Sequence, residues 1–296
     1  MKIIKLLLLV ALAMVVKYWV FQPITITSNS MSNTLQKGDY TILNQWQKFF
    51  IGKSIQVKQN QVLAFHYPLD KGGIKEKIVY IKRCVGLPGD TLVVKNGQVE
   101  KNTILKLKFD YVVNDPKNLI SMGFLKKMNL DLEAKKLNDL WLLSMDEAQV
   151  KKFSSLNTSL KLKKITQHEY KFEPSIFPSD TLKKWNRDFY GPLYIPKSGD
   201  KISLNAQNIS LYSKIIEIHE NHTLERTPTA ILIDDEVCET YTFNQNYYFF
   251  MGDNRHQSQD SRHWGFVPEN HLIGTCTGVL FNVENLSTKR LLKSVH

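Results

Sequence analysis

Three segments of this chain share one pattern: a Gly-Asp pair followed at once by a short run of β-forming residues. Glycine and aspartate favour tight turns, and a turn that leads into branched or aromatic residues is typical of the start of a strand. The repeated pattern therefore predicts a scaffold built mainly from antiparallel strands. The pairs are Gly38-Asp39, Gly89-Asp90 and Gly199-Asp200, and the runs that follow them are 40–43, 91–94 and 201–204.

Other β-rich runs support the same scaffold. Asn96-Gly97 lies between two such runs, and this dipeptide is a strong signal for a two-residue hairpin turn. The remaining strand candidates are 62–67, 78–85, 230–233, 247–251 and 278–282.

The middle of the chain follows a different pattern. Ser144 and Glu147 have the spacing of a capping box and predict a short helix that continues through Phe153. We therefore predict that residues 101–190 form a lysine-rich insertion of mixed helix and strand on the β scaffold. From Phe124 to Ser155, apolar residues recur with helical spacing, at Leu125, Met128, Leu132, Leu137, Leu140 and Trp141.

An apolar stretch opens the chain. A helix from Ile3 to Phe21 would be roughly 28 Å long, about the thickness of a hydrocarbon core. Lys2 and Lys5 lie at its start, and Tyr18-Trp19 suit the far interface. The same features also fit a cleavable signal peptide. This segment alone leaves a membrane anchor and a signal peptide as nearly equal interpretations.

The chain is basic, with a formal net charge of +11 over 296 residues. Such a balance fits a solvated surface, an anionic membrane surface or a nucleic-acid partner. Much of the excess lies in lysine pairs that are spread out among acidic residues, which favours a solvated face. No nucleic-acid recognition motif accompanies the charge, so nucleic acid is the least favoured partner.

The three cysteines, Cys84, Cys238 and Cys276, are far apart and lack metal-ligand spacing. We predict free thiols, with one pair bridging in an oxidising compartment as the alternative. Clustered histidines and carboxylates are also lacking, so the sequence implies no metal and no cofactor.

Three clusters carry the residues of chemical interest. They are Ser28–Met31, 80–90 and 251–265. Each has an ordinary explanation when taken alone: a serine-rich turn, an exposed lysine on a strand, and a Gly-Asp turn.

Together and in this order, the clusters resemble the type I signal peptidases. The first family motif, Ser-x-Ser-Met, occurs at 28–31. The second, Lys-Arg-x-x-Gly-x-Pro-Gly-Asp, occurs at 82–90, and the third, Gly-Asp-Asn-Arg-x-x-Ser-x-Asp-Ser-Arg-x-x-Gly, at 252–265. The resemblance covers about 21–100 and 190–281. The long insertion is similar, more weakly, to Bacteroidetes-type members.

This resemblance implies a membrane-bound serine endopeptidase that removes N-terminal signal peptides from exported preproteins through an acyl-enzyme. Ser30 corresponds to the nucleophile and Lys82 to the general base. Ser28, with the backbone N–H of Ser30, corresponds to the oxyanion hole, and Ser258 to the residue that orients the lysine. The residues that correspond to structural positions near the site are Asp253, Asp260 and Arg262, the last two as an ion pair.

The chain departs from the family motifs at three places. Asn29 replaces a glycine or proline, Ser32-Asn33 replaces a proline-containing step, and His256-Gln257 replaces an Asp-Asn pair. These changes affect local turns and the substrate pockets and leave the catalytic matches in place.

A lysine can activate a serine only when its amine is neutral. Its ordinary pKa of roughly 10.4 must therefore fall, which burial achieves. In an extended strand Tyr80, Lys82 and Cys84 point to one side, so Tyr80 and Cys84 can form an apolar bed for the amine. Arg83 points to the other side.

The resemblance also implies substrates with small residues at the first and third positions before the cut. An extended peptide that adds to a sheet edge presents alternate side chains to two shallow pockets. We predict that the segments 24–27 and 62–65 form this edge.

The implied location is a bacterial plasma membrane, with the catalytic domain on the extracytoplasmic side and lipid as a partner. The candidate nucleophile lies nine residues after Phe21, which favours an uncleaved single-pass anchor. The predicted division is an anchor at 1–22, a first catalytic part at 23–100, the insertion at 101–190, a second catalytic part at 191–285 and a basic tail at 286–296.

Three alternatives remain open. His256 or His263 would be the base of a Ser/His/Asp hydrolase, but no Gly-x-Ser-x-Gly motif occurs. Self-cleaving repressor-type proteases share the Ser/Lys pair but carry a DNA-binding domain, for which there is no room before Ser28. A non-catalytic membrane scaffold is the third, although such a protein is expected to lose the serine or the lysine.

Overall fold

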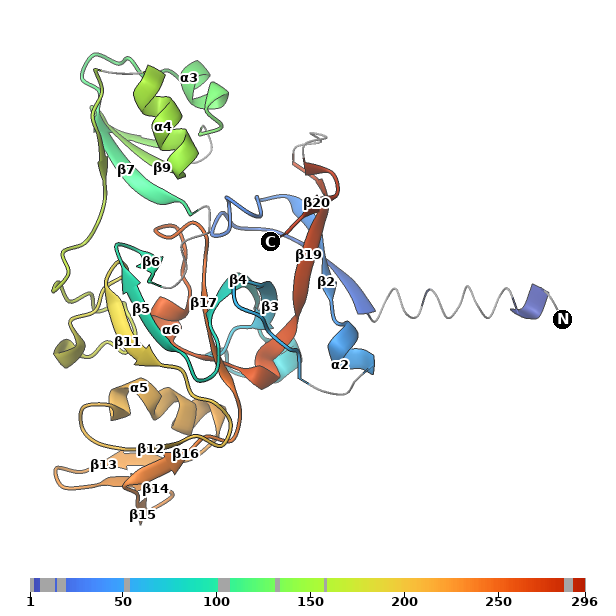
Figure 1. Ribbon diagram of the computed structural model, residues 1–296, viewed down its shortest axis with the longest axis vertical. Helices are drawn as coiled ribbons and strands as arrows, with labels where there is room; N and C mark the ends of the chain where they lie inside the picture. The colour runs from blue at the N-terminus through green and yellow to red at the C-terminus, as the bar shows by residue number, and fades with distance from the viewer. Residues whose placement is uncertain are drawn as a thin grey trace.

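The computed structural model describes residues 3–5, 14, 20–50, 54–100, 107–130, 134–156, 159–284 and 290–295. The fold is mainly antiparallel β, as predicted. Figure 1 shows a central sheet, a lobe that carries α3 and α4, and a smaller unit with α5 and β12–β16 at the opposite end. We refer to residues 107–164 as the lobe.

The central sheet has eight strands, and its named pairings are antiparallel. It includes the predicted strands at 40–43, 62–67, 78–85, 247–251 and 278–282, which are confirmed. From one edge the order is β1 (Phe21–Thr25), β2 (Asp39–Asn44), β19 (Leu272–Asn282), β3 (Val62–His66), β4 (Val79–Gly86), β17 (Tyr247–Met251) and β18 (Val267–Pro268), with β20 (Lys293–Ser294) paired to β19.

Three smaller sheets extend this core. The Asn96-Gly97 hairpin is confirmed, since both residues have positive φ (53° and 77°) and join β5 to β6. The strands are β11 (Tyr190–Tyr194), β5 (Thr91–Lys95) and β6 (Gln98–Val99); β12 (Lys201–Ser203) and β16 (Thr240–Thr242); and β13 (Leu224–Arg226), β14 (Ile231–Ile233) and β15 (Glu236–Val237).

The Gly-Asp pattern marks the start of β2, β5 and β12, so all three predicted strand entries are confirmed. The glycines share one conformation, with φ of 82° at Gly38, 90° at Gly89 and 83° at Gly199. Residues with a Cβ rarely adopt this conformation, which explains why glycine occupies the turn before each strand.

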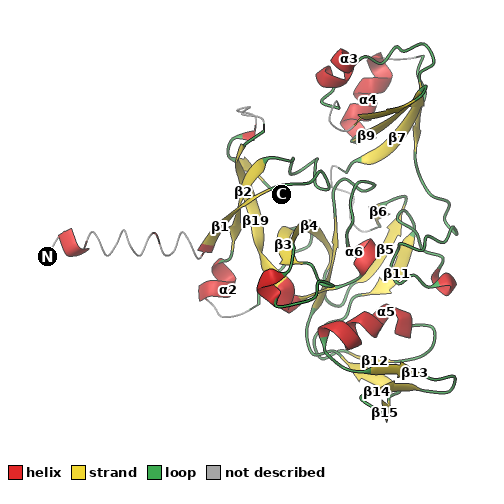
Figure 2. Ribbon diagram, turned by 180° about the vertical axis from the view of Figure 1, so that it is seen from behind, coloured by secondary structure: helices red, strands yellow, loops and turns green. Residues whose placement is uncertain are grey.

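The lobe contains a four-stranded sheet covered by two helices (Figure 2). The predicted helical periodicity is wrong between 134 and 145, where the chain forms a hairpin that turns at Asn138 (φ 54°). Trp141, Leu143 and Met145 are buried, and alternation of this kind is the period of a strand. Leu132 lies outside the described residues. The elements are β7 (Phe109–Asn114), α3 (Met122–Lys127), β8 (Ala134–Leu137), β9 (Leu140–Met145), α4 (Glu147–Leu156) and β10 (Leu162–Lys164).

The predicted helix after Ser144 exists as α4, but the predicted cap is wrong. Ser144 belongs to β9. Asp146 and Gln149 form the capping box, because Asp146 Oδ1 accepts from Gln149 N at 2.8 Å and Gln149 Oε1 accepts from Asp146 N at 3.0 Å. The capping pair that forms, Asp146 and Gln149, lies two residues after the predicted pair, Ser144 and Glu147.

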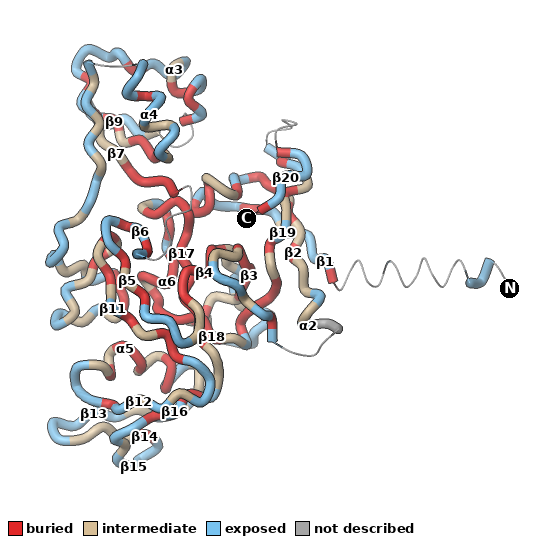
Figure 3. Tube along the Cα trace, in the orientation of Figure 1, coloured by how far each residue is buried: buried red, intermediate tan, exposed pale blue. Residues whose placement is uncertain are grey.

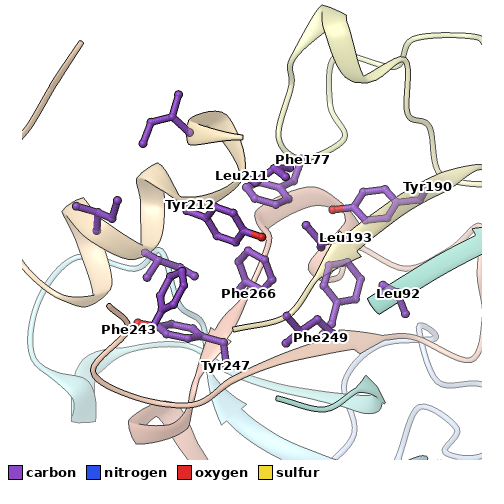
Figure 4. Packing of buried hydrophobic residues seen from close by; sticks show 14 of the residues in the cluster. Leu92, Phe177, Tyr190, Leu193, Leu211, Tyr212, Phe243, Tyr247, Phe249 and Phe266 are labelled. Carbon is purple, nitrogen blue, oxygen red and sulfur yellow. The ribbon is translucent and has the colours of Figure 1, made fainter. Parts of the chain in front are cut away.

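The largest buried cluster joins the central sheet to the smaller units. Figure 4 shows Tyr190 and Leu193 of β11 facing Phe249 of β17, with Tyr212 and Phe266 beside them. Every residue of β17 is buried (Figure 3), so this strand is the centre of the molecule. The remaining short helices are α2 (Trp46–Phe50), η1 (Ile74–Glu76), η2 (Thr181–Lys183), α5 (Ile209–Lys214), the π-helix η3 (Ile215–His219), α6 (Ser261–Trp264) and η4 (Glu269–His271).

Two further predictions concern the N-terminal anchor and the cysteine thiols. Most of the predicted anchor at 1–22 lies outside the described residues, and no helix within the described part is long and apolar enough to cross a membrane. The three cysteines are free, as predicted: Cys84 and Cys276 are buried and Cys238 is half-buried.

A buried ion pair fixes the C-terminal segment to the first part of the sheet. Arg290 Nε donates to Asp39 Oδ1 at 3.1 Å, and Arg290 Nη2 also contacts Asp39 Oδ2. Asp39 is fully buried and also accepts from Asn282 Nδ2 at 2.8 Å. The C-terminal segment is therefore part of the folded core.

We predict that Arg290→Ala lowers the free energy of unfolding by about 3 kcal/mol, because the buried carboxylate of Asp39 loses its charged partner. Chemical denaturation measures this change. Lys37→Ala is the control, since Lys37 and Glu284 form an ion pair with side chains 55% and 50% exposed. Equal effects of the two substitutions would show that Arg290 contributes no more than a surface charge.

Candidate active site

Ser30 and Lys82 meet in the interior of the molecule. Lys82 Nζ lies 2.5 Å from Ser30 Oγ, and the two residues are 3% and 7% exposed. Lys82 is on β4, and Ser30 is in a turn that follows β1. The side chains of Met31 and Leu35 are buried in the core below this turn, so packing fixes the position of the serine.

The surroundings of Lys82 disfavour its charge. Burial lowers its pKa to about 8, against the opposing attraction of Asp260 and Asp253. The Tyr80 ring is on the same side of β4, with its centroid 5.4 Å from the amine, as strand alternation predicts. A neutral amine within hydrogen-bond distance of a hydroxyl can accept its proton.

Ser28 lies beside the pair at a more exposed position. Its Oγ is 3.2 Å from Ser30 Oγ, so its hydroxyl lies directly beside the Ser30 hydroxyl. A hydroxyl donor in this place can stabilise a developing oxyanion, and the predicted role of the Ser30 N–H stays a prediction.

Ser258 is close to the backbone of Ser30 and is buried, at 5% exposed. Gly252 separates the two: a Cβ at position 252 would lie 2.6 Å from both Ser30 O and Ser258 Cβ. The Ser258 hydroxyl contacts Gln259 O at 3.4 Å. Its predicted role in orienting the lysine stays a prediction.

Two buried ion pairs support the site. Arg83 points away from the amine, as predicted, and its Nε and Nη2 donate to Asp253 at 2.8 and 2.6 Å. Arg262 Nε and Nη2 donate to Asp260 at 2.9 and 2.8 Å. Burial alone would raise the pKa of Asp260, but the charge and hydrogen bonds of Arg262 prevail and hold that pKa well below its usual range.

Asp260 connects α6 to Gly252, which directly follows β17. It caps α6 by accepting from Arg262 N, and its Oδ2 accepts from Gly252 N at 3.0 Å. Figure 1 shows α6 next to β17. This arrangement fixes the position of the loop that holds Ser258.

A cleft of about 260 Å³ leads to Ser30. Its walls are Ile24–Ser28, on and after the edge strand β1, and Ile78–Lys82, just before and on β4. The predicted edge at 24–27 therefore lines the cleft. The predicted edge at 62–65 is wrong, because β3 is paired on both sides, with β19 and with β4. Of β4, only the Arg83–Gly86 half pairs with β17 among the described residues.

The histidines that were considered as alternative bases have other partners. His256 Nε2 is 2.8 Å from Asp188 Oδ1, and its Nδ1 accepts from Asp110 N at 3.1 Å. His263 Nδ1 accepts from Asp260 N at 3.3 Å within the cap of α6. The group at hydrogen-bond distance from Ser30 Oγ that can act as a base is Lys82.

Sequence reasoning assigned no role to Asn254, although it lies inside the third cluster. Its backbone N–H donates to Ser30 O at 3.0 Å, and its Nδ2 donates to Asn29 O at 3.2 Å. The only sequence signal was its place within the motif. In the part of the chain that is described, no group of three or more His, Cys, Asp or Glu side chains has the arrangement of a metal site.

The family described as signal peptidase, peptidase S26, matches residues 1–164 and 195–281 of this chain. Three similar proteins are named signal peptidase I. The protein of Buchnera aphidicola subsp. Schizaphis graminum is 27% identical, covering 91% of this chain and 71% of the relative. Aquifex aeolicus has one that is 24% identical over 92% and 80% of the two chains, and Haemophilus influenzae has one that is 26% identical over 93% and 67%.

We predict that Gly252→Ala lowers the free energy of unfolding by about 1–3 kcal/mol, because the new methyl group would overlap Ser30 O and the Ser258 side chain. Thermal or chemical unfolding measures the loss. Gly73→Ala is the control, because position 73 has a φ of −65° and open space where the new Cβ would lie. A stable Gly252→Ala protein would mean that Ser30 and Ser258 are less tightly packed than described.

Proposed function

The chain belongs to the signal peptidase family, peptidase S26, and we propose that this enzyme removes signal peptides with Ser30 as nucleophile and Lys82 as general base. The observation that carries the proposal is the 2.5 Å contact between Lys82 Nζ and Ser30 Oγ in a buried setting. A scaffold without activity would have no need to keep an amine in such a place, since burial of its charged form is unfavourable.

In the proposed first step, Ser30 Oγ attacks the carbonyl carbon of the scissile peptide bond while its proton passes to Lys82 Nζ. The tetrahedral oxyanion accepts hydrogen bonds from the Ser28 hydroxyl and the Ser30 N–H. Lys82 then gives the proton to the leaving amine, which departs as the new N-terminus and leaves an ester on Ser30. A preorganised donor of this kind contributes roughly 3–4 kcal/mol to the transition state.

In the second step, Lys82 takes a proton from water, and the resulting hydroxide attacks the ester carbonyl. Collapse of the second tetrahedral species breaks the bond to Ser30 Oγ and returns the proton from Lys82 to the serine. We propose that Ser258 orients the amine in both steps, which is supported by its buried position across Gly252 from Ser30. The ion pairs of Asp253 and Asp260 keep the surrounding loops in place.

The proposed substrate is an extended preprotein segment with small residues at the first and third positions before the cut. The cleft supports this, because one wall is the edge strand β1 and the other is the half of β4 not paired with β17. An extended segment between these walls presents alternate side chains to the same face of the cleft. Ile24, Ile26 and Ile81 are apolar residues of those walls.

We further propose that residues 1–22 anchor the enzyme in a bacterial plasma membrane, with the catalytic parts on the extracytoplasmic side. The apolar sequence of this segment supports the anchor. Phe21 and Trp46 are 40% and 47% exposed, and the register Phe21 with Asn44 brings both near the point where the chain enters the sheet. Exposed aromatic rings at such a point suit a membrane interface.

We predict that Ser30→Ala and Lys82→Ala each reduce preprotein cleavage by more than about a thousandfold, since each removes a group that acts in the chemical step. The assay uses the detergent-solubilised full chain and a preprotein, with the new N-terminus read from the product. Ser175→Ala, at an exposed serine, is the matched control. Wild-type turnover by Ser30→Ala would rule out Ser30 as the nucleophile.

The activity should rise with pH. The neutral amine of Lys82 is the reactive form, so kcat/KM should increase through an apparent pKa near 8 and level off above it. A pH profile of cleavage over the range in which the protein stays folded measures this. An acid optimum would contradict a lysine base.

Stability should depend on pH in the same direction. The pKa of Lys82 is about 8 when folded, against an ordinary 10.5, so between these values the unfolded chain binds more protons and folding becomes more favourable as pH rises. Lys82→Met should therefore increase the free energy of unfolding at pH 7, by roughly 3 kcal/mol at most. Lys201→Met, at an exposed lysine, should change it little.

A further inference from the structure

The lobe makes direct contact with the loop that holds the nucleophile in place. Ser144 on β9 donates its hydroxyl hydrogen bond to Asn254 Oδ1 at 2.9 Å, and both residues are buried, at 2% and 0% exposed. We propose that Ser144 and Asn254 are positioning residues, through which the lobe holds the turn of Ser30 in its reactive geometry. This inference rests on the proposed function, because it takes Ser30 as the nucleophile.

Asn254 contacts the nucleophile turn on both sides of Ser30. Its backbone N–H donates to Ser30 O at 3.0 Å. Its Nδ2 donates to Asn29 O at 3.2 Å and to Ser32 Oγ at 3.1 Å. One side chain and one N–H therefore hold the turn at residues 29, 30 and 32, and with them the direction of Ser30 Oγ.

Ser144 supplies the donor that the amide oxygen of Asn254 needs. An amide group has nearly the same shape after a rotation that exchanges its oxygen and nitrogen, so only its partners fix the orientation. Asn29 O can only accept and therefore requires Nδ2 on its side, and the Ser144 hydroxyl donates to Oδ1 on the other side. Without that donor, Oδ1 would be a buried acceptor with a lost partner, and the orientation that supports the turn would be less favoured.

The backbone of the lobe reinforces this contact. Lys108 pairs with Asn254 as an isolated bridge: Lys108 N donates to Asp253 O at 3.0 Å, and Arg255 N donates to Lys108 O at 3.0 Å. These bonds place the start of the lobe alongside the loop of residues 253–255. That loop is therefore held by the lobe on one side and by the Ser30 turn on the other.

His256 and Gln257, the two residues that depart from the third family motif, also face the lobe. Gln257 Nε2 donates to Asp110 Oδ2 at 2.8 Å, and His256 Nδ1 accepts from Asp110 N at 3.1 Å. An aspartate at position 256 would stand against Asp188, whose Oδ1 is 2.8 Å from His256 Nε2. The departures at 256 and 257 thus fit a loop that has adapted to this lobe.

The direct test is Ser144→Ala in the full-length enzyme. We expect kcat for preprotein cleavage to fall about tenfold to a hundredfold, as for a misplaced reacting group, while KM changes less than about twofold. Ser144→Thr keeps the hydroxyl and should recover most of kcat. Ser155→Ala is the matched control, since Ser155 is an exposed serine on α4 of the same lobe.

A second variant and a second readout separate positioning from a general loss of stability. Asn254→Asp keeps the acceptor for Ser144 but removes the donor to Asn29 O. The kcat of this variant should therefore fall at least as far as the kcat of Ser144→Ala. The pH at the midpoint of the activity profile should stay unchanged in Ser144→Ala, because Lys82 keeps its surroundings. A purely structural role predicts instead a lower unfolding midpoint with kcat per folded molecule unchanged.

Three outcomes would overturn the proposal: wild-type kcat in Ser144→Ala, the same loss in Ser155→Ala, or no recovery in Ser144→Thr. The Ser30→Ala variant distinguishes a failure of the positioning role from a failure of the proposed function. Activity in Ser30→Ala would overturn the assignment of the nucleophile itself. An inactive Ser30→Ala protein beside a fully active Ser144→Ala protein would overturn the positioning role alone.

Discussion

An amine can take a proton from a serine only where water does not keep it charged, and this requirement shapes the whole centre of the molecule. Lys82 is on an interior strand, next to β3 on one side and near fully buried β17 on the other. The sheet therefore supplies the apolar surroundings that lower the pKa of the amine. The serine reaches the amine from a turn that two buried apolar side chains hold against the same sheet.

Alternation along β4 separates two neighbouring cations. Lys82 points into the cleft, while Arg83 points to the opposite face and is paired with Asp253. A strand gives this separation between adjacent residues, whereas a helix would place them about 100° apart. The charge of Arg83 is thus matched where it is buried, and the amine of Lys82 is left without a carboxylate in hydrogen-bond contact among the described residues.

Sequence reasoning reached the strands from local turn signals, and it reached the proposed pair of Ser30 and Lys82 from motifs that resemble those of a family. The turns before β2, β5 and β12 need a positive φ that few residues other than glycine adopt, so the glycines in the sequence predict these turns. The hairpin at 134–145 was missed because Leu137, Leu140 and Trp141 also fit a helical spacing, and only the sheet formed with β7 decides between the two. The same limit applies to β3, whose place inside the sheet depends on a distant partner, β19. The contacts of Asn254 with Ser144 join residues 110 positions apart, and no local pattern signals them.

The short edge strand β1 has a mechanical consequence. It begins at Phe21 and its five residues span about 17 Å, after which residues 26–28 lead to the turn that holds Ser30. Its pairing with β2 makes this piece stiff. If residues 1–22 are held in a lipid layer, the length of β1 sets the distance between that layer and Ser30. The place of cutting along an emerging chain would then be measured from the lipid as well as read from its side chains.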